Sequence, residues 1–398
     1  MVTSDINQFK NVYYPVAAEE VKNIVNELTT KGINIIAMGN GSRVYNFIGN
    51  TTKPTAALCL NKLNKVIEIN PRNFMASVEP GITFFEFQEA VKKYNMWLPI
   101  LSMQSENRTI GGMIADNIYN YVKYRYNNIG DYIIGLEFVT PSGQIIKTGG
   151  KTVKNVAGYD FTRFLNGSFG TLGIITKVAL KLKVIPQIRK SFLFKVHDIE
   201  RGIEILREIH KMALSVASYH IFNFSTGMCL DCFTNSSVVA AVDLEGSENV
   251  MIDHLNKLST LMDEINTEHR IIESTDFWNE FDLKYRSINM TVKIAGTVNK
   301  KYLSQFTNLL KNNLKPTCNL LIDEGTGDFI LHTCDSDYES IKQCIDNKLE
   351  DYSIIITSDK KKPHPLYRTI KTNIDKNNCL FSNNTILSLE DCIIRSES

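Results

Sequence analysis

Residues 149–178 read GGKTVKNVAGYDFTRFLNGSFGTLGIITKV, a glycine-rich stretch that passes directly into an apolar run. Glycine inside a regular element costs roughly 0.5–1 kcal/mol relative to alanine, so this clustering indicates positive φ angles or a backbone pressed against another surface. A turn-rich linker is the alternative interpretation. The run GIITKVALKLKVI at its end predicts a long strand over 173–185.

Composition describes an ordinary globular chain. It has 398 residues, 43% of them hydrophobic and 22% charged, which predicts two or three domains with substantial cores. Lys plus Arg number 44 against 43 Asp plus Glu, so the net charge of +1 gives no field that would recruit nucleic acid. The N-terminus has no signal-peptide pattern, and no apolar stretch reaches the roughly 18 residues of a membrane span. We therefore expect a cytoplasmic protein without a transmembrane segment.

The cysteines do not predict a metal site. Eight are scattered through the chain, and only Cys229 and Cys232 form a C-x-x-C pair. No second pair stands at ligand spacing, so two half-buried strand residues are the favoured interpretation over metal or redox chemistry.

The first half of the sequence predicts one α+β domain over residues 1–187. Val21, Val25 and Leu28 recur at helical spacing, and Gly32 follows as a helix terminator. A second helix places Phe84, Phe87 and Val91 on one face. Strands are predicted by short apolar runs, and a Pro-Ser-Gly turn predicts a hairpin; these segments are INIIAM (33–38), TAALCL (55–60), KVIEI (65–69) and IIGLEFVTPSGQIIKTGG (133–150).

From residue 188 the pattern changes to a regular alternation of helices and strands that occurs twice. It corresponds to the β-α-β-β-α-β order of a ferredoxin-like sheet, once partial and once complete. The amphipathic helices fit a two-layer domain with all helices on one face of the sheet. We therefore expect a second α+β domain over 188–360, followed by a C-terminal tail over 361–398.

Three glycine-bearing segments of the first domain suggest a large ligand. GNGSR (39–43) matches neither the Rossmann fingerprint nor the P-loop, and it could be a simple turn. Successive backbone N–H groups in such a loop can also form a nest for a diphosphate. TIGGMIADN (109–117) and GYDFTRFLNGSFGTLGI (158–174) also lie beside β runs, and this combination suits a dinucleotide.

KNVAGYD followed by GSFGTLGIIT resembles the FAD-binding segment of the vanillyl-alcohol oxidase/p-cresol methylhydroxylase (PCMH) superfamily, in particular the E-type FAD-binding subunit of glycolate oxidase. MGNGSR and LPILSMQSENRTIGGMIADN agree with this family in order and spacing. The resemblance implies a two-part PCMH-type FAD-binding domain over 1–187, a ferredoxin-like cap over 188–360, and a tail over 361–398 that packs back on the FAD domain.

The resemblance also implies which residues hold FAD. Backbone amides of the first loop would wrap the diphosphate, the T-x-GG segment would line the ribityl chain and flavin ring, and the 159–174 stretch would support the site and meet the adenine. In this sequence these positions are Gly39, Asn40, Gly41, Ser42, Arg43, Thr109, Gly111, Gly112, Ala115, Asn117, Tyr159, Asp160, Gly173 and Ile174. Arg43 could instead be a solvated side chain, and Gly173 could simply shape the turn before the last strand. Some members attach FAD to a histidine, but the first histidine here is His197, so we expect non-covalent FAD.

Enzymes of this family remove a hydride from a 2-hydroxy acid, which requires a base and a cation for the carboxylate. The histidine-rich cap motif H-x-H-x-G-D-G-N of the hydroxyacid-oxidising relatives is absent. EGTGDFILHT (324–333) offers Asp328 and His332, and SYHIFNF (218–224) offers His220. We nominate His220 and His332 as candidate bases, with structural strand histidines as the alternative.

Three hypotheses about activity follow. The first is a glycolate oxidase-type subunit that handles electrons from glycolate or D-lactate in a hetero-oligomer with a catalytic D-type and an iron–sulfur subunit, at the membrane only through these partners. The second is a self-sufficient D-2-hydroxyacid dehydrogenase. The third is a flavin-binding partner without turnover of its own.

Overall fold

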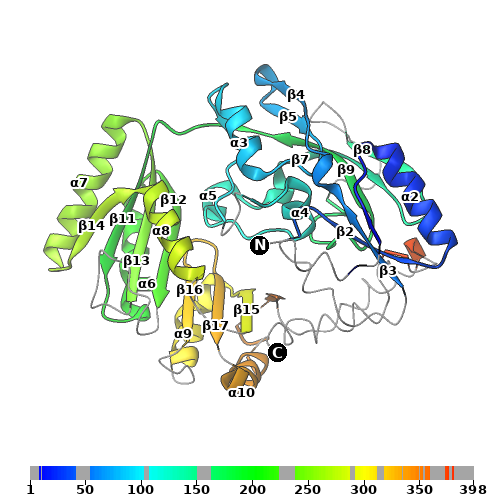
Figure 1. Cartoon of the computed structure of the whole chain (residues 1–398). Coiled ribbons are helices and arrows are strands. Elements are labelled where there is room, and N and C mark those ends of the chain that lie inside the picture. Colours follow the sequence, from blue (N-terminus) through cyan, green and yellow to red (C-terminus); the bar gives the residue numbers. More distant parts are fainter. Residues whose placement is uncertain are drawn as a thin grey trace.

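The computed structural model describes residues 9, 11–41, 54–102, 107–149, 163–223, 238–286, 292–311, 318–333, 335–348, 350–352, 355–358, 373–375 and 379–380. Figure 1 shows the first half of the chain, in blue and cyan, beside a second half dominated by one large sheet. No helix of the described residues is long and apolar enough to cross a membrane.

The chain begins with a small parallel sheet of order β1-β3-β2, covered by helix α2. Its elements are β1 (Asn11–Tyr13), α2 (Ala18–Thr30), β2 (Asn34–Met38) and β3 (Thr55–Cys59). Val21, Val25 and Leu28 of α2 are fully buried, as their spacing predicts. The helix ends before Gly32, whose φ of +66° is readily adopted by glycine.

An antiparallel sheet of order β4-β5-β9-β7-β8 forms the second part of this half. Its strands are β4 (Val66–Asn70), β5 (Met75–Val78), β7 (Ile133–Val139), β8 (Ile145–Gly149) and β9 (Ile174–Lys181). Helices α3 (Phe84–Lys92), α4 (Ile110–Ala115) and α5 (Lys123–Tyr126) lie in the connection between β5 and β7, and the short strands β6 (Met96–Trp97) and β10 (Lys183–Val184) pair with each other. The predicted hairpin over 133–150 therefore corresponds to β7 and β8.

The second half is a single eight-stranded antiparallel sheet of order β14-β11-β13-β12-β16-β17-β15-β18. Its first four strands are β11 (Ile188–Lys195), β12 (Val216–Asn223), β13 (Val238–Gly246) and β14 (His269–Glu273), with helices α6 (Ile199–Lys211) and α7 (Glu248–Glu264). The other four are β15 (Val292–Thr297), β16 (Asn319–Asp323), β17 (Asp328–Thr333) and β18 (Ile355–Ser358), with α9 (Leu303–Lys311) and α10 (Asp335–Asp346).

Each group of four strands has the ferredoxin-like order 4-1-3-2, and the two units join through their second strands, β12 and β16. Both units are therefore complete, whereas the sequence pattern predicted a partial first one. That prediction named neither β11 nor β14, which pair with each other at one end of the sheet. β14 is a five-residue edge strand with the polar sequence HRIIE, and it gives no alternating pattern.

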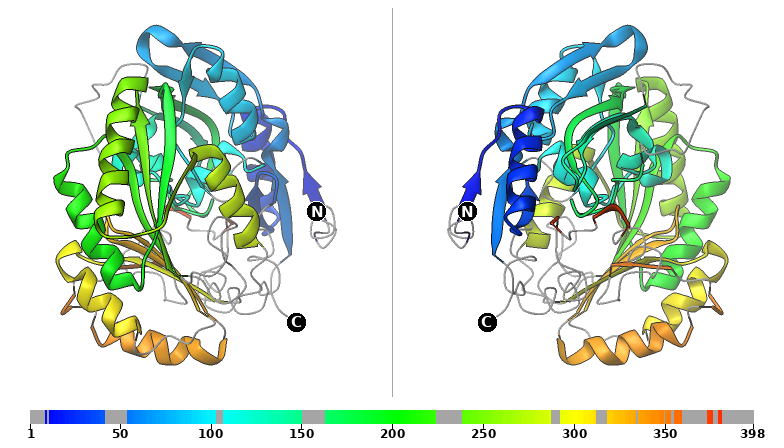
Figure 2. Two further views of the ribbon diagram at one scale, coloured as in Figure 1. Left: turned by 90° about the vertical axis from the view of Figure 1, so that its left-hand side faces the viewer. Right: turned by 90° about the vertical axis from the view of Figure 1, so that its right-hand side faces the viewer.

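The two faces of this sheet have different environments. Helices α6, α7, α9 and α10 cover the outer face, and their apolar side chains form one large core with it (Figure 2). Helix α8 (Ser274–Arg286), which the sequence analysis did not predict, lies on the opposite face, toward the first half of the chain. There the Trp278 ring stacks on Tyr121, with ring centroids 4.4 Å apart, so the two halves share an aromatic core.

Candidate functional site

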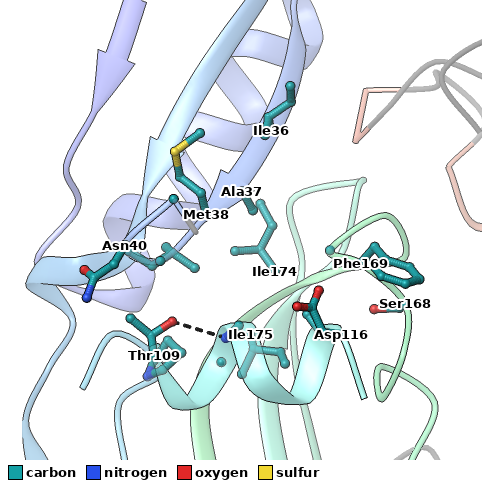
Figure 3. Close-up of a pocket in the computed structure, with 18 of the residues that line it drawn as sticks. Ile36, Ala37, Met38, Asn40, Thr109, Asp116, Ser168, Phe169, Ile174 and Ile175 are labelled. Carbon is teal, nitrogen blue, oxygen red and sulfur yellow. Dashed lines mark hydrogen bonds between the residues drawn. The ribbon is translucent and has the colours of Figure 1, made fainter. Parts of the chain in front are cut away.

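A pocket of about 830 Å³ opens where both sheets of the first half meet. Its walls come from β2, the loop after it, the first turn of α4, the loop 168–170 and the start of β9. In Figure 3, Asn40 and Thr109 lie at one end of the pocket and Ser168 and Phe169 at the other.

The loop after β2 presents backbone to this pocket. Gly41 has a φ of +72°, and Asn40 Nδ2 donates a hydrogen bond to the Asn107 carbonyl over 2.9 Å. The amides of Asn40 and Gly41 donate no hydrogen bond to any residue that the structure describes. A Cβ on Gly39 would lie 2.0 Å from Thr109 Oγ1, so only glycine allows this close approach to α4. The loop thus offers N–H donors in the form of an anion-binding nest.

Helix α4 closes another wall. Thr109 caps it by accepting a hydrogen bond from the Gly112 amide at 3.2 Å (Figure 3). The Gly111 amide donates to the Pro80 carbonyl, and a Cβ there would lie 2.6 Å from Pro80 Cβ. Gly112 and Ala115 also line the pocket. The T-x-GG segment is therefore a close-packed helix start that exposes little side chain.

The last wall is the loop before β9. Phe169 and Gly170 both have positive φ angles, of 52° and 73°, and the Phe169 amide donates to the Ala115 carbonyl. A Cβ on Gly173 would lie 2.9 Å from the Phe138 ring. Gly173 and Ile174 line the pocket, as Ser168, Phe169 and Gly170 do. The glycines of the described part of the opening stretch thus place backbone against this pocket.

Most of the nominated residues that are described come together in this pocket: Gly39, Asn40, Gly41, Thr109, Gly111, Gly112, Ala115, Gly173 and Ile174. Asn117 is not among the lining residues; its Oδ1 accepts from Asn166 Nδ2 and holds the neighbouring loop. Ser42, Arg43, Tyr159 and Asp160 lie outside the described residues, as do Cys229 and Cys232.

Sequence reasoning missed two charged residues in the pocket lining, Arg108 and Asp116. They form an ion pair across the N-cap and C-cap ends of α4, and both side chains are about nine-tenths buried. A lone arginine before TIGG gave no signal of this pairing, because its partner lies eight residues away. Only the helical turns between them bring the two together.

The candidate bases His220 and His332 lie on one face of the cap sheet. His220 on β12 is opposite Asp323 on β16, which is opposite Asp328 on β17. Directly paired residues share a face, and His332 is four residues beyond Asp328, so all four occupy the face toward the first half of the chain. Burial lowers the pKa of His220 to about 3 and that of His332 to about 4, so both rings are neutral at pH 7.

The environment of His220 is aromatic. The residue is fully buried, and its ring lies 5.2 Å from the Trp278 ring and 6.1 Å from the Tyr121 ring. Neither ring nitrogen has a hydrogen-bond partner in the part of the chain that the structure describes. Buried polar atoms normally have one, so these nitrogens are open to a ligand or water.

Asp323 is a second acidic group that sequence reasoning missed. Burial, followed by the nearby charge of Asp328, raises the pKa of its carboxyl to about 8. Its Oδ1 accepts the Thr326 amide at 3.2 Å, whereas Asp328 is paired with Lys123 Nζ at 2.5 Å. Asp323 is therefore protonated near neutral pH and can donate a hydrogen bond.

Comparisons with known proteins agree with this geometry. Residues 9–149 match the family model described as FAD binding domain. The glycolate oxidase subunit GlcD of Bacillus subtilis is 28% identical over 258 residues, which cover 63% of this chain and 54% of that protein. The D-lactate dehydrogenase of Archaeoglobus fulgidus is 32% identical over 209 residues, covering 51% of this chain and 46% of that protein.

Solved structures show the same fold over nearly the whole chain. Alkyldihydroxyacetonephosphate synthase matches with a TM-score of 0.71 at 17% identity, covering 93% of this chain and 76% of that one. p-Cresol methylhydroxylase matches with a TM-score of 0.64 at 16% identity, covering 93% and 87%. Residues 9–149 therefore form an FAD-binding domain, and the chain as a whole shares the fold of these two solved structures. It spans about half the length of the two curated relatives named above.

The pocket fits FAD. A diphosphate needs clustered N–H donors, and the amides of Asn40 and Gly41 are open to the pocket. The glycines at 39, 111 and 173 let the walls of the pocket pack closely, because a Cβ at each would lie 2.0, 2.6 and 2.9 Å from Thr109, Pro80 and Phe138 respectively. The apolar lining of Ile36, Ala37 and Ile174 suits the adenine and dimethylbenzene parts.

Proposed function

We propose that this chain is a member of the vanillyl-alcohol oxidase/p-cresol methylhydroxylase superfamily and oxidises a small 2-hydroxy acid such as glycolate or D-lactate, as a subunit that passes the electrons to a partner. The observation that carries this proposal is the convergence of three separate glycine segments on one pocket. The cap sheet adds buried acids and histidines on its face toward the first half. The relatives named for glycolate and D-lactate supply the substrate class.

The proposed binding roles follow from the pocket. Gly39, Asn40 and Gly41 hold the diphosphate through their amides, with Ser42 and Arg43 continuing the loop. Thr109, Gly111, Gly112 and Ala115 lie along the ribityl and ring portion, and Gly173 with Ile174 along the adenine. Tyr159, Asp160 and Asn117 support these segments. When bound, non-covalent FAD supplies the hydride acceptor.

Proton handling is assigned to the cap face. His220 and His332 are neutral at pH 7, the form that can accept the proton of the substrate hydroxyl, although the burial that lowers both pKa values also disfavours the protonated ring and makes both weak bases. Asp323, which keeps its proton, can donate a hydrogen bond to a substrate oxygen. Each group thus has the protonation state that its proposed role requires at neutral pH.

The subunit role rests on what the cap lacks. It does not carry the histidine-rich motif of hydroxyacid-oxidising relatives, which favours action beside a catalytic D-type subunit and an iron–sulfur subunit. The two other proposals are a self-sufficient D-2-hydroxyacid dehydrogenase and a flavin-binding partner without turnover.

The visible absorption spectrum of the purified chain tests these proposals. It is recorded anaerobically with FAD, before and after addition of glycolate, D-lactate and L-lactate. Bleaching of the flavin bands by one acid would show that the isolated chain oxidises it, and would contradict the proposal of a flavin-binding partner without turnover. Flavin that stays oxidised until the partner subunits are added supports the subunit role, and failure to bind FAD at all contradicts the cofactor assignment.

The histidine assignment has its own test. We expect His220→Ala or His332→Ala to slow flavin reduction at least 100-fold, because general-base catalysis is typically worth 10²–10⁴ in rate. His197→Ala, at a fully exposed position, is the control. Unchanged reduction rates in both variants would remove the two histidines from the mechanism.

A further inference from the structure

A second pocket, of about 1520 Å³, lies between the two halves of the chain and shares no lining residue with the FAD pocket. Helix α3 and strand β6 form one wall, and α8 of the cap forms the other. Nine large apolar or aromatic residues line it: Phe84, Met96, Trp97, Ile100, Leu101, Tyr121, Ile185, Trp278 and Leu283. Leu283 is 67% exposed at its edge, so the apolar surface continues to the outside of the molecule.

Two buried N–H donors at this pocket have no partner. Trp97 is 7% exposed, and its Nε1 makes no hydrogen bond with any residue of the chain that the structure describes. The same holds for Arg189 Nη2. The Arg189 guanidinium lies 4.7 Å above the centre of the Trp97 ring, so both donors occupy one corner. Buried donors normally have an acceptor, and this corner calls for one from a ligand.

The charged groups at this corner leave one guanidinium nitrogen open. Glu245, which is 2% exposed, accepts a hydrogen bond from Arg189 Nε at 3.0 Å. Arg125 Nε lies 3.4 Å from the same carboxylate, but its side chain is 41% exposed, so solvent screens its charge. Asp243, a second buried carboxylate, accepts a hydrogen bond from Trp278 Nε1 in the pocket wall. Among the described residues, the group that this corner lacks is therefore an acceptor for Arg189 Nη2 and Trp97 Nε1.

We propose that this pocket binds an apolar monocarboxylate, with its chain or ring against the aromatic walls and its carboxylate against Arg189 and Trp97. A neutral amphiphile would match the walls but would offer the Arg189 guanidinium no charged acceptor. Charge-assisted hydrogen bonds from a guanidinium are among the stronger ones, so the carboxylate should dominate recognition. This proposal does not depend on which acid the flavin oxidises.

The chain has two tryptophans, and both Trp97 and Trp278 line this pocket. Intrinsic fluorescence of the FAD-loaded full chain therefore reports its occupation directly. We expect decanoate to change the emission saturably, with an affinity at least tenfold higher than that of decanol. Equal affinities would overturn the carboxylate as the recognised group, and no saturable change with decanoate would overturn the site.

Three variants locate the binding. Arg189→Gln should weaken decanoate binding at least tenfold and leave decanol binding within twofold. Asn279→Phe, at an exposed lining position of α8, should block both ligands, whereas Asp276→Phe, on the same helix outside the lining, should block neither. Flavin content and circular dichroism check folding. Should Arg189→Gln fail to fold, Asn279→Phe decides: unchanged decanoate binding in that variant contradicts the proposal.

Discussion

At the scale of single residues, Gly39 determines how closely the first loop approaches α4. A Cβ there would lie 2.0 Å from the hydroxyl of Thr109, which is 3% exposed and caps the helix. We expect Gly39→Ala to push the loop from the helix and to weaken FAD binding at least tenfold, measured by quenching of FAD fluorescence. Gly32→Asn is the control, since Gly32 has open space around it and asparagine tolerates its φ of +66°. Equal FAD affinity in both variants would mean that the loop does not hold the cofactor.

The carboxyl of Asp323 should make stability depend on pH. Burial raises its pKa to about 8 in the folded chain, far above the ordinary value for an aspartate, so the folded state retains a proton that the unfolded chain releases. The stability that comes from this retained proton is fully present below about pH 4 and is lost as pH rises toward 8. Asp323→Asn removes this ionisation. The difference in free energy of unfolding between the variant and the unchanged protein should therefore be roughly 1–3 kcal/mol more favourable to the variant at pH 9 than at pH 5. Urea unfolding at both values checks this, with Asp276→Asn as an exposed control; parallel shifts in both variants would refute it.

At the scale of elements, the start of α3 is fastened to the start of α4. Thr83 and Glu86 form a reciprocal capping box, and Thr83 is bridged to Thr109, with the Phe84 amide donating to the Arg108 carbonyl. We expect Thr83→Ala to cost about 1 kcal/mol and also to weaken FAD binding severalfold, because the cap holds the T-x-GG segment. Thermal unfolding and FAD titration measure the two effects, and Thr83→Ser should restore both. A loss of stability with unchanged FAD affinity would show that the N-cap of α3 does not influence the FAD pocket.

The sequence predicted those features that depend on residues close together in the chain, and it missed those that depend on contacts between distant segments. Helices α2 and α3 were predicted because Val21, Val25 and Phe87 recur at a helical period. The loop residues Ser168 to Gly170 were not nominated, since their part in the pocket depends on a hydrogen bond from Phe169 to Ala115 of another element. Asp323 was missed for the same reason: only the pairing of β12, β16 and β17 buries it beside Asp328. The motifs predicted the cofactor, whereas the burial of Asp323 beside Asp328 depends on tertiary packing.

At the scale of the whole molecule, the halves are joined by a polar contact beside the aromatic one. Glu245 of β13, in the cap, is bound by Arg189 and by Tyr126 of the first half, and Arg125 lies close. Lys123 of α5 makes a further ion pair with Asp328 of the cap. Both contacts involve the short segment after α4, so the FAD pocket and the cap face are positioned by one stretch of chain. This coupling is not visible in either domain's sequence pattern.

Removal of the Glu245 charge should therefore loosen the whole molecule. Breaking a buried ion pair by removing one partner typically costs about 3–5 kcal/mol, because the remaining charge loses its compensation. We expect Glu245→Gln to lower the free energy of unfolding by an amount near this range in urea titrations. Glu268→Gln breaks the pair with Lys195, whose side chains are 34% and 44% exposed, and should cost less than about 1 kcal/mol. If the two substitutions cost the same, Glu245 is not the buried link between the halves, which then depend on the stacking of Tyr121 on Trp278 and on the ion pair of Lys123 with Asp328.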